Sequence, residues 1–276
     1  MTATTTFRIL GSGSSPGNPR IGGDWGLCDP TEPKNRRRRA SLLVTRATAD
    51  GRATRVLVDA GPDLREQMLD AGVDWVDGVV FTHAHADHCH GIDDLRAFVL
   101  NRRRLVKVWT DEPTSKRLHE AFGYCFKTPP GSAYPPILEE HRMTVGHHTV
   151  IQGEGGAIEF TPFRQIHGDV DSLGLRFGSV AYSTDVSDFP KESLSHLARL
   201  DLWILDALRP RSHPSHLSVD EALGWIARKA PRHAVLTHLH NDQDYATLKA
   251  RLPEGVEPAW DGLEFSFSQA EDPLRG

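Results

Sequence analysis

The feature that most constrains this chain is a short hydrophobic run that ends in a dense cluster of side chains able to bind metal. Residues 79–82 are apolar or β-branched and predict a buried strand. The six positions that follow read His-Ala-His-Ala-Asp-His. Imidazole nitrogens and carboxylate oxygens together suit zinc, manganese or iron. The ligand-type residues of this cluster are His83, His85, Asp87 and His88.

The spacing within the cluster predicts two ions. His83 and His85 can reach one ion from the same side of an extended segment, whereas Asp87 and His88 point towards a second. The small alanines between them leave room for the backbone to turn. Two neighbouring ions acidify a shared water, which is the chemistry of a two-metal hydrolase, and Asp87 is a candidate for catalysis as well as for metal binding. The alternative, a histidine-rich turn without metal, does not explain the strand that leads into the cluster.

Ligand-type side chains also follow predicted strands in the second half of the chain. His167 comes shortly after the strand-like segment 157–163, and we expect its ring at the edge of a sheet beside the first pair of histidines. Asp185 stands just after the apolar run 180–183, where a carboxylate directly follows a strand. Both positions are therefore candidate metal ligands.

The last ligand is ambiguous from the sequence. Residues 233–237 form a predicted strand, and a histidine follows it directly, as His83 follows its own strand. Because strand ends are uncertain by about a residue or two, either His238 or His240 can complete the second ion's ligands.

The segment 83–88 matches the H-x-H-x-D-H signature of the metallo-β-lactamase superfamily, and the chain resembles that superfamily over most of its length. The resemblance implies an α/β fold, a four-layer αββα sandwich built as one domain from residues 1–276, with the metals at one edge between two sheets. It also implies that Asp185 bridges the two ions. The implied ligands are His83, His85, Asp87, His88, His167, Asp185 and either His238 or His240.

Within the superfamily, the run from Gly11 to Arg39, the single His216 and the Thr237-His238 ending are similar to the phosphodiesterase branch, in particular to the phosphoribosyl 1,2-cyclic phosphate phosphodiesterase family. That family uses manganese, together with a structural zinc bound by clustered cysteines in the early loop. Here the loop keeps only Cys28, so we expect two divalent ions, Mn²⁺ or Zn²⁺, and no structural zinc. The long arm of tRNA-processing relatives is not evident, and we do not expect a nucleic-acid substrate.

Hydrolysis also needs a proton donor that no metal holds. Val219 to Ala230 reads as a helix with Ser218 as its N-cap, and His216 stands on a loop just ahead of it. A histidine with a pKa near neutrality suits this task, and we predict that His216 is the general acid. His213 is its reserve or its partner at the substrate. The alternative is that His216 only packs against the start of the helix.

Four consecutive arginines, residues 36–39, end a long polar loop and lead into a predicted strand at 40–44. A guanidinium held near the interior suits a phosphate, and Arg39 is our candidate for substrate binding. A solvated surface segment is the alternative. Asp59, at the end of the strand-like run 55–58, has two roles open to it: it orients a metal-bound histidine, or it caps the following turn.

Composition narrows the class of protein further. The 276 residues are 38% hydrophobic and 25% charged, as in ordinary soluble globular proteins, and the net charge of −5 gives no general attraction to nucleic acid or membrane. No apolar stretch is long enough to span a bilayer, and the three cysteines are scattered. We expect a cytoplasmic protein, and the oligomeric state stays open, with a homodimer as one option.

These features predict a metal-dependent hydrolase of small cyclic phosphodiesters. Two alternatives stay open: a lactone or thioester hydrolase that uses the same two ions, and a metal-binding sensor without turnover. The free His216 favours an enzyme, and the basic early loop favours a phosphorylated substrate.

Overall fold

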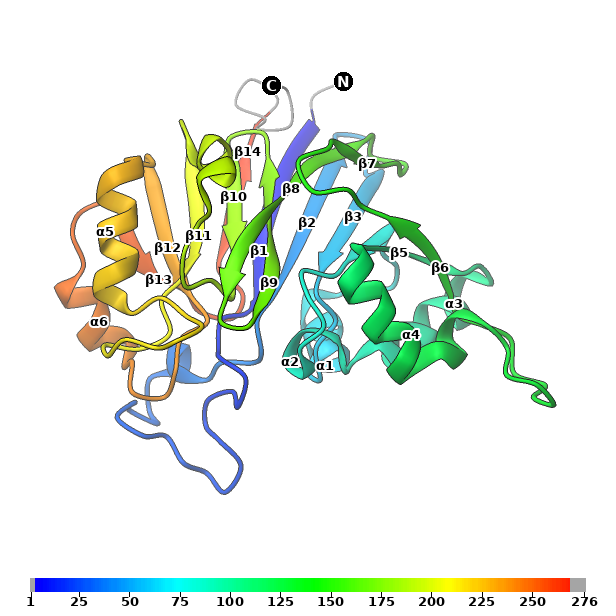
Figure 1. Ribbon diagram of the computed structural model, residues 1–276, viewed down its shortest axis with the longest axis horizontal. Helices are drawn as coiled ribbons and strands as arrows, with labels where there is room; N and C mark the ends of the chain where they lie inside the picture. Colours follow the sequence, from blue (N-terminus) through cyan, green and yellow to red (C-terminus); the bar gives the residue numbers. More distant parts are fainter. Residues whose placement is uncertain (1–2, 269–276) are drawn as a thin grey trace.

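Two sheets of seven strands each face one another in the computed structural model, which describes residues 3–268 (Figure 1). The first sheet has the order β14 (Glu264–Phe267), β1 (Ala3–Gly11), β2 (Ser41–Thr48), β3 (Ala53–Val58), β4 (Gly78–Val80), β5 (Val106–Thr110) and β6 (Leu138–Arg142). The second has the order β13 (Val256–Pro258), β12 (His233–Thr237), β11 (Leu202–Asp206), β10 (Val180–Ser183), β9 (Val170–Phe177), β8 (Ile158–His167) and β7 (Thr149–Ile151).

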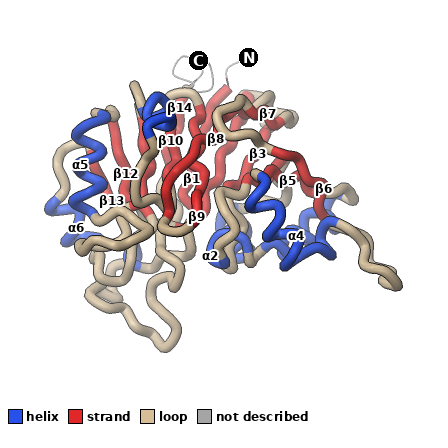
Figure 2. Tube along the Cα trace, viewed as in Figure 1, coloured by secondary structure: helices blue, strands red, loops and turns tan. Residues whose placement is uncertain are grey.

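Helices cover the outer face of each sheet, as Figure 2 shows by colour. On the first sheet they are α1 (Leu64–Ala71), α2 (Ala86–Cys89), α3 (Arg96–Arg102) and α4 (Glu112–Phe126). On the second they are α5 (Val219–Lys229) and α6 (Tyr245–Arg251). The layers are therefore α, β, β and α, which confirms the predicted four-layer sandwich. Among the described residues, no helix is both long and apolar enough to cross a membrane.

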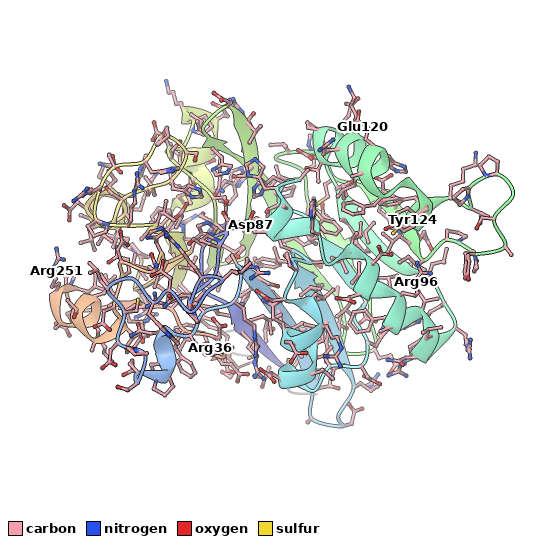
Figure 3. All side chains as sticks on the ribbon, turned by 90° about the horizontal axis from the view of Figure 1, so that it is seen from below. Arg36, Asp87, Arg96, Glu120, Tyr124 and Arg251 are labelled. Atoms are coloured by element: carbon pink, nitrogen blue, oxygen red, sulfur yellow. The ribbon has the colours of Figure 1, made fainter. Side chains whose placement is uncertain are left out.

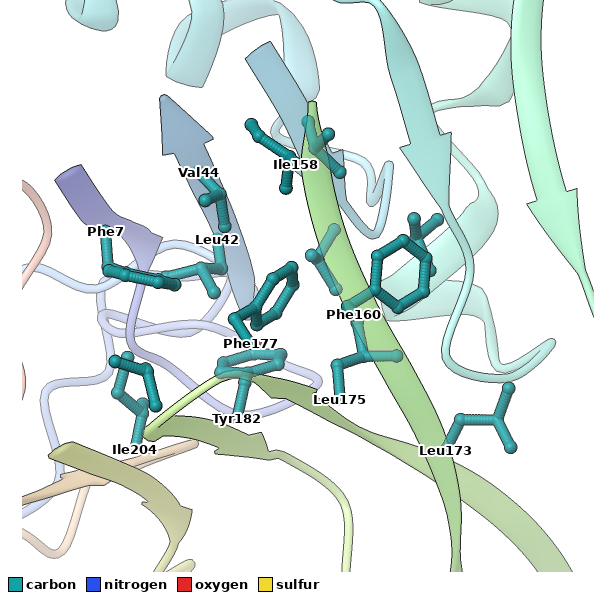
Figure 4. Close-up of a cluster of buried hydrophobic side chains, with 14 of the residues drawn as sticks. Phe7, Leu42, Val44, Ile158, Phe160, Leu173, Leu175, Phe177, Tyr182 and Ile204 are labelled. Atoms are coloured by element: carbon teal, nitrogen blue, oxygen red, sulfur yellow. The ribbon is translucent and has the colours of Figure 1, made fainter. Parts of the chain in front are cut away.

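The layering follows from strands that bury both faces. Successive side chains of a strand point to opposite sides, so Leu42 and Val44 of β2 join the core between the sheets while Leu43 joins the core under the helices of the first sheet. In the second sheet Ile204 faces the inner core and Trp203 faces α5 and α6. Figure 4 shows the inner core, where side chains of both sheets meet: Phe7, Leu42, Val44, Phe177, Tyr182 and Ile204.

The strand directions decide where a site can form. Strands β3 to β6 run parallel to one another, and so do β10 to β13. The carboxyl ends of parallel strands meet at one edge of a sheet, where the following loops form the usual ligand crevice of α/β folds. In Figure 1 this edge is the lower one, and the dark-blue segment that follows β1 hangs beneath it.

The predicted helix that follows Ser218 is confirmed as α5. The helix at 64–71 ends at Gly72 in a left-handed conformation, and Ser218 forms the capping box with Glu221 at the start of α5. Helix α4 continues to Phe126. Residues 127–136 form an extended loop, which projects from the body with Tyr134 exposed (Figure 1).

Candidate metal centre

Two groups of ligand-type side chains lie at the shared edge of the two sheets. The first consists of His83, His85, His167 and Asp185, and the second of Asp87, His88, Asp185 and His238. In each group, one ligand atom per residue lies within 4.8 Å of all the others. Seen from below, Asp87 lies near the middle of this edge, between the two halves of the molecule (Figure 3). The structure thus brings together residues that are up to 155 positions apart in the chain.

Asp185 belongs to both groups because its two oxygens face different histidines. Oδ2 lies 3.7 Å from His83 Nε2 and 3.5 Å from His167 Nε2. Oδ1 lies 3.0 Å from His88 Nε2 and 3.2 Å from His238 Nδ1. Burial opposes the charge of this carboxylate, but His238, His88 and His83 outweigh it and hold the pKa of Asp185 well below its usual range. An ionised carboxylate between two sets of ligands is the arrangement that a pair of cations requires.

The donors of these groups fit metal ions better than they fit one another. His83 Nε2, Asp87 Oδ2, His88 Nε2 and both ring nitrogens of His238 are buried without a hydrogen-bond partner among the described residues. Buried polar atoms normally have partners, and leaving them unpaired is costly. Burial, together with the neighbouring His88, lowers the pKa of His83 well below its ordinary value, so its ring is neutral and available as a ligand. Imidazole and carboxylate donors of this kind bind zinc and manganese.

Hydrogen bonds orient the imidazole rings of His88 and His167 through the ring nitrogen that faces away from the metal groups. Asp59 accepts from His88 Nδ1 at 2.8 Å, and from the backbone N–H and hydroxyl of Thr82, each at 2.8 Å. His167 Nδ1 donates to the carbonyl oxygen of Ser215 at 2.6 Å. Such contacts fix which ring nitrogen is free for a metal. Of the two roles that the sequence left open for Asp59, the structure shows the orienting one.

His216 lies beside the two groups and outside both. Its Nδ1 lies 2.7 Å from Asp206 Oδ2, and its Nε2 lies 3.9 Å from Asp185 Oδ2. Burial disfavours the protonated ring, but the Asp206 carboxylate outweighs that effect and raises the pKa of His216 to about 9. The pair therefore presents a proton on Nε2 towards the groups. Sequence reasoning missed Asp206, although it ends the apolar run 202–205 in the same way that Asp59 follows 55–58.

Of the two histidines that the sequence left open as the last ligand, the structure places only one among the grouped ligand atoms. His238 belongs to the second group. His240 does not: its Nε2 meets the guanidinium of Arg20, and its Nδ1 lies 3.2 Å from Asp242 Oδ1. His240 is therefore placed apart from the ligand atoms.

The expected substrate-binding residues lie in two loops. Arg39 Nε contacts Asp63 Oδ2 at 3.1 Å, and its two terminal nitrogens have no partner among the described residues. His213 Nδ1 lies 3.1 Å from Ser215 Oγ, and its ring is 5.2 Å from that of His216, centroid to centroid. Of the four arginines, Arg37 is the buried one, and it contacts other loops.

The fold and the edge geometry define a metallo-hydrolase with the αββα architecture. A family profile described as the beta-lactamase superfamily domain matches residues 54–239, and the chain belongs to that superfamily, with the metallo-β-lactamase fold.

Three known proteins are similar to this chain. A crystal structure described as a new diphosphatase from the PhnP family shares 36% identity and a TM-score of 0.84, over 98% of this chain and 99% of that one. A curated Porphyromonas gingivalis protein named octanoyltransferase is 33% identical over 260 residues, or 93% of this chain, and the chain spans 50% of its length. Zinc-bound PqqB from Methylobacterium extorquens has 18% identity and a TM-score of 0.66, over 94% and 99% of the two chains, and shares the fold.

Proposed function

We propose that the protein is a metal-dependent phosphodiesterase that hydrolyses small phosphodiesters, cyclic ones among them, and that the same site can cleave the phosphoanhydride bond of a diphosphate. The observation that carries this proposal is Asp185, whose two oxygens face two separate sets of histidines, with the His216–Asp206 pair alongside. The 36% identity to a diphosphatase that spans the same length supports cleavage at phosphorus.

Two divalent ions, Mn²⁺ or Zn²⁺, bound by these groups would supply an acidified water and positive charge for the phosphoryl oxygens. The protein's own residues supply the rest. Asp87 Oδ2, which has no hydrogen-bond partner among the described residues, is available to bind metal and to accept a proton from the attacking water. His216 Nε2 delivers a proton to the departing oxygen, while Asp206 holds Nδ1 and so fixes the ring's orientation.

Two further side chains have donors free for a phosphorylated substrate. The unpartnered terminal nitrogens of Arg39 match the oxygens of a phosphoryl group. His213 Nδ1 accepts from the backbone N–H of Ser215 at 3.3 Å, so in the neutral ring the proton lies on Nε2. Burial and the neighbouring His216 lower the pKa of His213, which favours that neutral form. His213 is thus a donor that stays uncharged at neutral pH.

A second candidate function is hydrolysis of an acyl thioester or lactone at the same ions. The relative named octanoyltransferase favours it, although the chain matches only half of that protein. The chemistry at the metals is similar for both classes, because each needs a polarised electrophile and an activated water. The two candidates differ in the leaving group and in the substrate's charge, and Arg39 favours the phosphorylated one.

A direct substrate comparison tests the proposal. Metal-free protein is loaded with Mn²⁺ or with Zn²⁺, the bound metal is counted by elemental analysis, and kcat/KM is measured for bis(p-nitrophenyl) phosphate, a dinucleoside diphosphate and an octanoyl thioester. We expect turnover of the phosphodiester and the diphosphate, loss of that turnover in Asp185→Asn, and normal turnover in His90→Ala. His90 is an exposed histidine of the same segment, outside both groups. Turnover of the thioester alone would select the second candidate, and no turnover with two bound ions would select a sensor.

A further inference from the structure

Arg37 forms a buried link between two loops at the metal edge. Its side chain is 2% exposed, although it carries a charge. Nη1 donates to the carbonyl oxygen of His240 at 3.3 Å, and Nη2 donates to that of Gln243 at 2.7 Å. Nη2 also donates to Asn35 Oδ1 at 3.1 Å. A single guanidinium therefore ties the loop that follows β1 to the loop that follows β12.

Arg37 is linked to the carboxylate of Asp244 by the side-chain amide of Asn35, which bridges the two. Asn35 Nδ2 donates to Asp244 Oδ2 at 2.7 Å, while Asn35 Oδ1 accepts from Arg37. Asp244 also caps α6 by accepting from the backbone N–H of Thr247 at 2.9 Å. The fork of Arg37 is thus anchored to the start of a helix, which gives it a rigid base.

The loop that Arg37 holds begins with a ligand in an unusual conformation. His238 has φ 58°, in the left-handed region, which is costly for a residue with a β-carbon and persists only where neighbours enforce it. Leu239 donates to the carbonyl of Ser12 at 2.8 Å and accepts from the N–H of Ser14 at 3.3 Å. His240, the next residue, has its carbonyl held by Arg37 and its ring by Arg20.

We propose that Arg37 is a positioning residue for the second ion: by fixing residues 239–243 it holds His238 in the left-handed conformation that points its ring at Asp185. This inference rests on the proposed two-metal centre. The first group lies on other segments and has no contact with Arg37. Loss of Arg37 therefore weakens the second ion selectively.

Calorimetric titration of metal-free protein with Zn²⁺ tests the proposal. Two reference variants assign the two binding phases: His85→Ala removes a ligand of the first group, and Asp87→Asn removes one of the second. In Arg37→Met we expect the second phase to weaken roughly ten- to hundredfold, as when other groups that orient ligands are lost. The first phase should keep its native affinity, because none of the contacts of Arg37 supports a ligand found only in the first group. Arg37→Lys keeps the charge but loses the fork, and should fall between native and Arg37→Met.

The control is Arg38→Met, which removes the neighbouring side chain that pairs with Asp70 at the surface. It should leave both phases unchanged. Equal weakening of both phases in Arg37→Met, or an unchanged second phase in a folded variant, would overturn the proposal. If neither Arg37→Met nor Arg37→Lys folds, Arg37 serves global folding, and the proposal is equally overturned. Native protein that binds fewer than two ions would instead reject the two-metal centre itself.

Discussion

Replacing Asp206 by asparagine isolates the electrostatic part of the proposed acid. The substitution keeps the size of the side chain and an oxygen that can accept from His216 Nδ1 and from the backbone N–H of Val186, contacts now 2.7 and 3.0 Å long. It removes the negative charge. That charge is what raises the pKa of His216 against the effect of burial, so we expect the pKa to fall to its ordinary value or below.

The size of the effect follows from the two pKa values. At pKa of about 9, nearly all of His216 is protonated near pH 7.5, whereas at about 6.5 roughly one tenth is. Because the pKa of His216 is raised, its ring stays protonated at pH values below that pKa and can act as the acid. The protonated ring, and with it the acid, is lost as the pH rises through the pKa. Bound divalent ions lower both values, but the order of native and variant stays the same. We therefore expect about a tenfold loss near pH 7.5, which disappears at low pH.

The assay is the pH dependence of kcat for a phosphodiester with a poor, alkoxide leaving group, such as a nucleoside cyclic phosphate, beside bis(p-nitrophenyl) phosphate, whose leaving group needs little protonation. Asp206→Asn should shift the descending limb to lower pH on the first substrate and change the second little. Asp201→Asn, directly before the start of β11 and near Arg232, is the matched control. A loss that is equal at every pH and on both substrates would refute the argument and leave Asp206 a structural role.

Three further predictions follow from the same contacts. Asp59→Ala leaves three buried donors without an acceptor, namely the N–H and hydroxyl of Thr82 and His88 Nδ1. Each unsatisfied donor costs about 1–3 kcal/mol, so the free energy of unfolding in urea should fall by at least ~3 kcal/mol. A smaller loss would mean that water replaces the carboxylate. Removing metal with a chelator should lower the melting temperature by roughly 10 °C. The reason is that each ion, at a free concentration of about 100 times its Kd, adds about 2.7 kcal/mol to the free energy of unfolding. An unchanged melting temperature would argue against tight binding. Phe177→Ala opens a cavity between Phe7 and Phe160. The free energy of unfolding in urea should fall by about 3–5 kcal/mol, while the number of bound metal ions stays the same. A loss below ~1 kcal/mol would mean that the two sheets close over the gap.

The four-layer fold followed from the family resemblance, whereas the strand ends that carry the candidate ligands were predictable from local signals. The dense cluster at 83–88 follows a strand, and short, largely apolar runs precede Asp185 and His238, so each candidate ligand marks the end of a strand. Parallel strands then bring those ends to one edge, which no single segment reveals. The ligand atoms that the structure groups together therefore match the predicted residues, with His238 rather than His240 in the second group.

What the sequence left undecided depends on contacts between distant loops. Asp206 ends a strand as Asp59 nearly does, but its partner His216 returns to it only through the loop after β11. The four consecutive arginines cannot be told apart in the sequence. In the structure, Arg37 is buried against the loop after β12, while the terminal nitrogens of Arg39 stay free to donate. These differences arise from which side of a short segment faces the interior, and local propensity does not determine that.

The same loop contacts explain why His238 and His240, two residues apart, lie in different surroundings. The backbone at His238 turns into the left-handed region directly after β12, so Leu239 and His240 leave the strand direction and run beneath the loop that follows β1. There Arg20 and Arg37 hold the ring and the carbonyl of His240. These contacts hold His240 by its ring and by its backbone, in the segment that directly follows His238. Arginines of an early loop, more than 200 residues away in the chain, therefore hold the segment that places His238, and not His240, beside Asp185.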